Sequence, residues 1–259
     1  MKIRIKNRAG KIIVGDLLYN KTSQVVKQPL MIISHGFLGT KNQSFFKRIA
    51  DDLFKEGIAS LRFDFTNSIG ESEGDLTKAT LTGYIEDLED VLNYARSLDF
   101  VGSIGLIGHS LGGFITIIVS ARHKVGCVVS LSASFYTDYS RLRFFAGKEI
   151  NLDEWREDGF LRVFSLLDNK YYNLSYDYYL DSRNYDLSDY LPKVSHILVI
   201  HGTKDKVLGV ENAKLIYEHA APPKKLFIID GLHHNYYKEP QLTQAVNAIL
   251  EWVKEWMVN

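Results

Sequence analysis

The 259-residue sequence contains no pair of cysteines and no long apolar run, and its first residues show no signal-peptide pattern. Its one cysteine, Cys127, has no partner for an internal disulfide, and its place in the apolar run 125–131 favours a small core residue over a nucleophile. Residues 1–6 alternate charged and apolar side chains and have no signal-peptide core. No apolar run approaches the roughly 20 residues that a membrane-spanning helix needs. We therefore predict a soluble, cytoplasmic protein that does not insert into a membrane.

An excess of charge of either sign is also missing, since the chain has 31 basic and 31 acidic residues. A balanced chain has no bulk field to attract nucleic acid or an anionic membrane. The sequence contains no G-x-G-x-x-G or Walker pattern, so we expect no nucleotide cofactor. It contains no His-Glu-x-x-His or cysteine pair either, and we expect no metal. What is present is an ordinary hydrophobic content of 46%, enough to bury a sizeable core.

The stretch 108–113, Gly-His-Ser-Leu-Gly-Gly, lies between two apolar segments. Residues 103–107 are typical of a buried strand, and residues 114–119 are apolar on nearly every side, as in a helix at the centre of a sheet. Ser110 would then lie at a tight strand-to-helix turn, where side chains in place of the flanking glycines would collide. The pattern Gly-x-Ser-x-Gly in this context is typical of a nucleophile elbow. The alternative is a glycine-rich turn with an incidental serine.

Strand and helix patterns alternate along most of the chain. Residues 2–6 and 11–18 predict an antiparallel hairpin. Buried strands are predicted at 29–34, 58–65, 103–107, 125–131, 196–200 and 225–229, and helices at 45–54, 81–95, 114–119, 209–221 and 242–253. This order implies an α/β fold with a mainly parallel sheet and helices on both faces. Functional residues are expected at the carboxyl ends of the strands.

The alternation stops between residues 133 and 190, where 15 of the chain's 32 aromatic residues occur. A disordered linker would be poor in aromatics, so we predict a mainly helical insertion that forms a small cap, or lid. The core would then consist of residues 1–132 and 191–259. The aromatic side chains either form a small core of their own or wall a substrate pocket. The same segment is a candidate surface for a homodimer.

Polar segments follow two later strands of the predicted sheet. Residues 201–207 include Asp205, and residues 230–236 include His233 and His234, so the chain order is Ser, Asp, His. A serine hydroxyl needs a neighbouring imidazole to take its proton during attack. The imidazole needs a carboxylate on its other nitrogen to fix its tautomer. We predict Ser110 as nucleophile, Asp205 as orienting acid, and His233 or His234 as base.

At this point the chain resembles the α/β-hydrolase family over essentially its whole length. The residues that carry the resemblance are His35-Gly36-Phe37, Arg62-Phe63-Asp64-Phe65, Gly108 to Gly113, His201 to Asp205, and Gly231-Leu232-His233-His234. The resemblance implies an α/β-hydrolase fold. It also implies His234 as the base, because members commonly place it three residues after the last glycine. An oxyanion hole formed by the backbone amides of Phe37 and Leu111 is implied as well.

Within that family, the chain looks most like small carboxylesterases of the cinnamoyl and feruloyl esterase branch and of the monoacylglycerol-lipase-like branch. It departs from the hormone-sensitive-lipase-like branch, whose oxyanion loop has more glycines than residues 35–39. His35 and His109 correspond to loop and elbow supports in the family. Two rivals to Asp205 remain. Asp138 follows the sixth core strand, where some relatives place their acid, and Asp64 lies at a strand end, although we expect it to pair with Arg62.

The sequence therefore predicts a serine carboxylesterase that acts on a small-molecule ester of small to medium size, with an aromatic or apolar acyl part and no cofactor. A peptidase, an amidase or a thioesterase could use the same triad, because the pocket chooses the leaving group. A non-catalytic binding protein of the same fold is a further alternative. A dehalogenase would need a carboxylate in place of Ser110.

Overall fold

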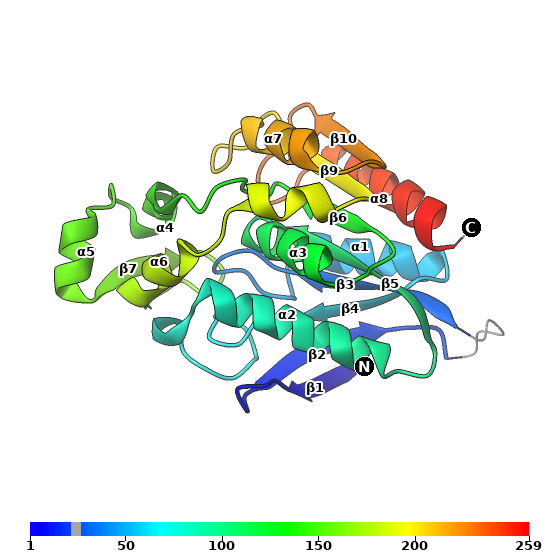
Figure 1. Cartoon of the computed structure of the whole chain (residues 1–259), viewed down its shortest axis with the longest axis horizontal. Helices are drawn as coiled ribbons and strands as arrows, with labels where there is room; N and C mark the ends of the chain where they lie inside the picture. Colours follow the sequence, from blue (N-terminus) through cyan, green and yellow to red (C-terminus); the bar gives the residue numbers. More distant parts are fainter. Residues whose placement is uncertain (22–26, 259) are drawn as a thin grey trace.

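The computed structural model describes residues 1–21 and 27–258, and its centre is an eight-stranded sheet (Figure 1). Residues 22–26 and 259 of the predicted core lie outside this description. The strand order is β1-β2-β4-β3-β5-β6-β9-β10. The pairs β1–β2 and β2–β4 are antiparallel, and every other neighbouring pair is parallel. These strands are β1 (Lys2–Lys6), β2 (Ile12–Leu18), β3 (Gln28–Ser34), β4 (Ala59–Phe63), β5 (Val101–His109), β6 (Val128–Leu131), β9 (Ile197–Gly202) and β10 (Lys224–Ile229).

Helices cover both faces of the sheet because the parallel strands are apolar on both sides. In β3, Leu30 and Ile32 pack into one apolar cluster, whereas Met31 and Ile33 pack into the other. The first cluster includes side chains of α2 (Leu81–Arg96), α3 (Leu111–Arg122) and α7 (Glu211–His219), and the second includes those of α1 (Ser44–Lys55) and α8 (Gln241–Met257). The predicted α/β-hydrolase fold, with a mainly parallel sheet and helices on both faces, is confirmed.

Residues 133–190, which we name the cap segment, lie between β6 and β9, and residues 143–182 of it project to one side of the sheet (left in Figure 1). The segment contains η2 (Tyr139–Leu142), α4 (Arg143–Ala146), α5 (Leu152–Asp158), β7 (Phe160–Ser165), β8 (Lys170–Ser175), α6 (Tyr176–Ser182) and η3 (Leu187–Asp189). Outside it lie the short helices η1 (Leu76–Lys78) and η4 (Leu191–Lys193). The prediction of a mainly helical insertion therefore missed the antiparallel hairpin β7–β8.

The residue pattern of the hairpin explains why it forms. Leu161 and Val163 are buried while Arg162 between them is exposed, which is the period of two expected of a half-buried strand. Asn169 adopts a left-handed φ of 58° at the turn, a conformation that asparagine tolerates better than most residues. The high aromatic content of the cap segment does not by itself distinguish this alternation from a helical pattern.

The cap segment packs on the core and has no separate core of its own. The buried Trp155, Leu161, Val163 and Leu174 belong to the same apolar cluster as α2 and α3. Asp181 also binds the first turn of α2, since it accepts hydrogen bonds from Thr82 N at 2.8 Å and Thr82 Oγ1 at 2.6 Å. In the described part of the chain, no helix combines the length and the apolar character needed to cross a bilayer.

Candidate active site

Ser110 lies between β5 and α3, in a backbone conformation that few non-glycine residues adopt (φ 55°, ψ −119°). The flanking glycines make this turn sterically allowed. A Cβ added to Gly108 would lie 2.2 Å from Gly112 O, and one added to Gly112 would lie 2.5 Å from His35 O. The strand-to-helix turn expected at residues 108–113 is therefore present. It holds the serine beside the N-terminus of α3, where the local field favours negative charge.

The structure brings Ser110, His234 and Asp205 together in one chain of hydrogen bonds. His234 Nε2 lies 3.2 Å from Ser110 Oγ, and His234 Nδ1 lies 2.7 Å from Asp205 Oδ2. Because a carboxylate can only accept, Nδ1 carries the proton and Nε2 is the acceptor facing the serine hydroxyl. The three side chains come from loops that follow β5, β9 and β10, at the carboxyl edge of the sheet.

The Asp205 side chain is completely buried yet fully hydrogen-bonded. Oδ1 accepts the backbone N–H groups of Val207 at 2.9 Å and Leu208 at 2.8 Å. Burial alone would raise the pKa of Asp205, but hydrogen bonds from His201, His234 and Leu208 N lower it well below its usual range. The carboxylate therefore stays ionised at neutral pH.

His201 is a site residue to which the sequence analysis gave no role. It lies in β9, its side chain is buried, and its Nε2 is 3.3 Å from Asp205 Oδ2 and 2.7 Å from Leu208 O. It thus contacts both the carboxylate and the loop whose amides bind that carboxylate. Its position four residues before Asp205 indicates a contact between the two side chains, because a strand end and the loop after it pack closely.

His109 contacts His234 from another side. Its Nε2 donates to the backbone carbonyl of His234 at 2.7 Å, and the two imidazole centroids are 4.8 Å apart. Burial, together with the neighbouring His234, lowers the pKa of His109 to about 3. The ring is therefore neutral and serves as a fixed hydrogen-bond donor, consistent with the expected role of an elbow support.

The two expected oxyanion residues both lie beside the serine. Leu111 is the first residue of α3, so its N–H belongs to the helix end that has no intrahelical acceptor. Phe37 follows Gly36, and a Cβ added to Gly36 would lie 3.0 Å from Ser110 Cβ. Phe37, Ser110 and Leu111 line one cavity together.

The competing residues have other partners. His233 stacks on Tyr237, with ring centroids 6.1 Å apart. Asp138 accepts a hydrogen bond from Ser140 N and lies 3.3 Å from Arg141 Nε.

The expected ion pair between Asp64 and Arg62 is wrong. Arg62 instead donates to Lys41 O at 2.7 Å and lies 3.9 Å from Asp16 Oδ2. The carboxylate of Asp64 binds backbone amides of Lys41 and Glu71. Asp64 lies one residue beyond the end of β4 at Phe63, so the alternation of the strand does not set the direction of its side chain.

Two cavities meet at Ser110. The smaller, of about 110 Å³, is mostly apolar; its lining includes Phe37, Leu111, Phe114, Leu142, Phe145, Trp155, Tyr178 and Tyr179. The larger, of about 460 Å³, also contains Ser110 and Phe37, and its lining includes His234, Asn235, Gln43, Phe164, Leu166 and Leu167. The cap segment contributes to both linings. Across residues 1–21 and 27–258, no group of three or more His, Cys, Asp or Glu side chains is arranged to hold a metal ion.

The family follows from comparison with known proteins. Residues 31–246 match the model of the alpha/beta hydrolase family. The chain belongs to this family. Among sequence relatives, this hydrolase is 29% identical over 226 residues to the uncharacterized protein YfhR of Salmonella typhimurium, covering 85% of this chain and 69% of that protein. It is 25% identical over 264 residues to an uncharacterized 31.7 kDa protein of Escherichia coli, covering 89% and 92%.

Solved structures of similar fold include esterases. Est1E from Butyrivibrio proteoclasticus, in a structure with ferulic acid bound, matches at a TM-score of 0.84 and 24% identity, over 99% of this chain and 100% of that chain. The esterase domain of a Rhodothermus marinus protein matches at a TM-score of 0.73 and 21% identity, over 99% and 98%. At these identities the similarity shows the shared alpha/beta hydrolase fold.

Proposed function

We propose that this alpha/beta hydrolase is a serine carboxylesterase that uses Ser110, His234 and Asp205. The observation that carries the proposal is the continuous hydrogen-bond chain from Asp205 through His234 to Ser110, at the point where two cavities meet. A serine at an elbow with both partners in contact is arranged for acyl transfer. Esterases among the solved structures of the same fold support the reaction class.

In the first half of the reaction, Ser110 Oγ attacks the ester carbonyl carbon while His234 Nε2 takes the hydroxyl proton. The carbonyl oxygen becomes an oxyanion, which the backbone N–H groups of Phe37 and Leu111 stabilise. His234 then gives its proton to the alkoxy oxygen, the C–O bond breaks, and the alcohol leaves. Throughout, Asp205 holds the ring orientation and stabilises the imidazolium.

In the second half, His234 Nε2 takes a proton from water, whose oxygen attacks the acyl carbon. The same two amides stabilise the second oxyanion. The proton returns to Ser110 Oγ as the acyl C–O bond breaks, and the carboxylic acid is released. The cycle consumes one water and needs no redox step.

We infer the places of the two halves of the ester from the positions of the cavities. The alcohol must leave on the side from which His234 donates its proton, and His234 lines the larger cavity. The acyl part then occupies the smaller, apolar cavity beside Leu111. A cavity of about 110 Å³ is well below the roughly 300–1,000 Å³ of pockets that hold drug-sized ligands. We therefore infer a compact acyl group, either a short chain or a single ring.

Hydrolysis of a p-nitrophenyl ester series tests this function. We expect acetyl, butyryl and benzoyl esters to give kcat/KM values about tenfold or more above those of long-chain esters, because a long acyl chain exceeds the small cavity. Ser110→Ala measured side by side supplies the background. A preference for long chains would place the acyl part in the larger cavity. Turnover of matching p-nitroanilides but not of esters would favour an amidase.

Replacing the orienting acid tests the role of Asp205. Asp205→Asn should lower kcat by about 10⁴-fold, since an amide facing His234 Nδ1 favours the wrong imidazole tautomer. Asp230→Asn is the matched control, because Asp230 is exposed at the same sheet edge and binds Thr203 Oγ1. If Asp205→Asn were nearly as active as wild type while Asp138→Asn were inactive, the acid would be Asp138.

We also propose that the cap segment, residues 133–190, covers the catalytic serine as a lid on the core made of 1–132 and 191–259. Support comes from the cap residues Phe145, Tyr178 and Tyr179, which line the smaller cavity together with Ser110. The contact between Asp181 and Thr82 fixes this cover to the core.

A further inference from the structure

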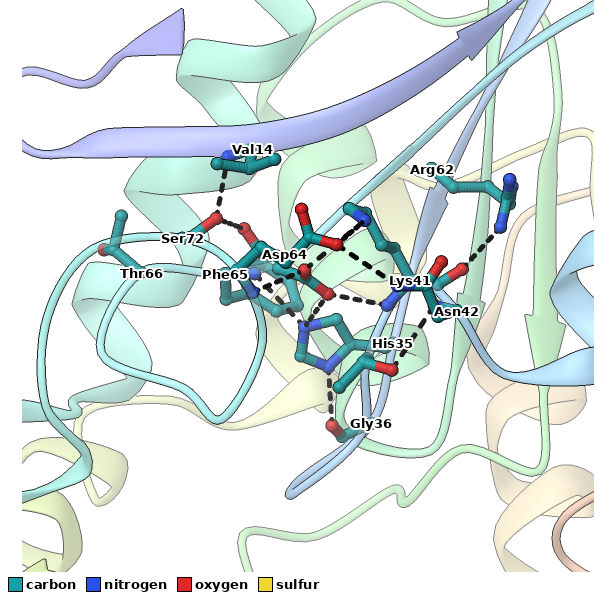
Figure 2. A network of polar contacts seen from close by, with 12 residues as sticks. Val14, His35, Gly36, Lys41, Asn42, Arg62, Asp64, Phe65, Thr66 and Ser72 are labelled. Carbon is teal, nitrogen blue, oxygen red and sulfur yellow. Dashed lines mark hydrogen bonds and ion pairs between the residues drawn. The ribbon is translucent and has the colours of Figure 1, made fainter. Parts of the chain in front are cut away.

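The carboxylate of Asp64 lies behind the loop that carries Phe37, and the catalytic scheme makes no use of it. Asp64 directly follows β4, and its side chain is completely buried. As Figure 2 shows, Oδ1 faces the backbone of Lys41, whose N–H it accepts at 2.6 Å. Oδ2 accepts the N–H of Glu71 at 2.8 Å. A buried carboxylate must keep such charge-assisted bonds, so it fixes the position of the backbone that donates them.

The backbone N–H, the backbone carbonyl and the ammonium group of Lys41 all have polar partners. Its side chain is 1% exposed, and its Nζ lies 3.1 Å from both Asp16 Oδ2 and Glu71 Oε1 and 3.9 Å from Asp64 Oδ2. Burial acts to lower the pKa of the Lys41 ammonium, but the hydrogen bonds to Asp16 and Glu71 raise it above its usual value. The lysine therefore stays charged at neutral pH. Its backbone carbonyl accepts the bond from Arg62 at 2.7 Å, so residue 41 cannot shift without breaking several contacts.

The other end of the same loop is fixed by His35. Phe65 N–H donates to His35 Nε2 at 3.1 Å, so the ring proton is on Nδ1, which donates to Gly36 O at 2.9 Å. Gly39 N–H donates to the same carbonyl at 2.9 Å. Gly36 C=O and Phe37 N–H belong to one planar peptide, so fixing the carbonyl fixes the direction of the N–H.

Between its two ends the loop adopts a backbone conformation that it would not hold alone. Leu38 has a φ of 50°, in the left-handed region that leucine rarely adopts. Such a conformation persists only where surrounding contacts over-determine it. His35 supplies those contacts at the near end, and residue 41 supplies them at the far end.

We propose that Asp64 and Lys41 are positioning residues for the oxyanion hole: they anchor the far end of the loop 35–41 and thereby hold Phe37 N–H toward the reacting carbonyl at Ser110. This inference rests on the proposed esterase function, because an oxyanion forms only if Ser110 attacks a carbonyl. Neither residue contacts the reacting atoms. Their effect passes through the backbone of the loop.

Comparing an ester with its thionoester isolates this role. The sulfur of a thionoester is a weaker hydrogen-bond acceptor than the carbonyl oxygen and sits farther from carbon, so it gains less from an oxyanion hole. In Asp64→Asn, one of the two backbone N–H groups would face an amide N–H instead of an oxygen. We expect kcat for the p-nitrophenyl ester to fall by about tenfold or more, with little change in KM, and the thionoester rate to fall by about threefold or less.

Ser72→Ala is the matched control. Ser72 Oγ donates to the backbone carbonyl of Asp64 at 2.5 Å and accepts Val14 N–H at 2.8 Å, so its loss disturbs the same region without touching the loop 35–41. Its ester-to-thionoester rate ratio should equal that of wild type. If Asp64→Asn lowered both rates equally, the proposal would be overturned. If Asp64→Asn failed to fold, Arg62→Met, which removes the bond to Lys41 O, should lower the same ratio, and an unchanged ratio would overturn the proposal.

Failure of the proposed function would look different. In that case wild type would show no Ser110-dependent turnover of either substrate. The structural part of the inference would then be decided by crystal structures of wild type and Asp64→Asn. A rotated or displaced Gly36–Phe37 peptide in the variant supports the anchoring role, and an unchanged peptide refutes it.

Discussion

Ser110→Ala should lower kcat for the best p-nitrophenyl ester by about 10⁶-fold while leaving the fold intact. In the proposed mechanism Ser110 Oγ attacks the carbonyl, so without it the site would retain only oxyanion binding. Because alanine carries a Cβ as serine does, the backbone at φ 55° is no more strained than before. Steady-state kinetics measure the loss, and thermal unfolding checks the fold.

Contamination by host esterases sets the background of this measurement, so the alanine variant must be purified in parallel with wild type. A residual activity above about one per cent of wild type, measured in that way, would contradict the assignment of Ser110, since removing a serine nucleophile costs far more than a hundredfold. The nucleophile would then lie elsewhere in the two cavities.

Alanine substitutions at the two adjacent histidines should differ widely in activity, and His233→Ala serves as the control for His234→Ala. His234→Ala should lower kcat by about 10⁶-fold, because Ser110 loses its only base and the leaving alcohol its proton donor. His233→Ala should stay within about threefold of wild type, since a change outside the site leaves the transition state nearly unaffected. His233 stacks on Tyr237 and does not share the hydrogen-bond chain.

Measuring both variants at several pH values separates a lost base from a displaced one. A lost base should leave a small residual rate that rises with hydroxide, because solvent replaces the imidazole. The reverse pattern, with His233→Ala inactive and His234→Ala active, would move the base by one residue and would contradict the 3.2 Å contact between His234 Nε2 and Ser110 Oγ.

Local rules explain why the sheet and the elbow could be predicted. Strands such as 29–34 and 196–200 are continuous apolar runs because both faces of a parallel sheet are covered, and few other structures require such runs. The glycines at 108 and 112 are needed because a Cβ at either position would overlap backbone atoms. Ser110, Asp205 and the pair His233–His234 could be placed together because parallel strands end at one edge, and the choice of His234 followed from the resemblance to the α/β-hydrolase family.

The remaining features depend on contacts between distant segments. Lys41 looks like an ordinary surface lysine in the sequence, and only the fold brings Asp16, Glu71 and Asp64 around it. Asp64 was expected to pair with its near neighbour Arg62. Instead both side chains bind the backbone of Lys41, which is far from them in the sequence.

The hairpin β7–β8 and His201 are each partly encoded in the local sequence. The alternation in β7 and the Asn169 turn predict a hairpin, yet the aromatic content of the cap segment favoured a helical interpretation. His201 lies close to Asp205 in the chain, but its contact with the carboxylate depends on how the loop after β9 folds back.

Covalent labelling would show directly whether Ser110 is the nucleophile. A fluorophosphonate reacts with an activated serine by forming a P–O bond and releasing fluoride, which leaves a stable adduct that mass spectrometry can locate. We expect one adduct per chain, on the peptide that contains Ser110, and no adduct in Ser110→Ala or His234→Ala. Labelling of another residue, or an unlabelled Ser110 in a preparation that hydrolyses esters, would contradict it.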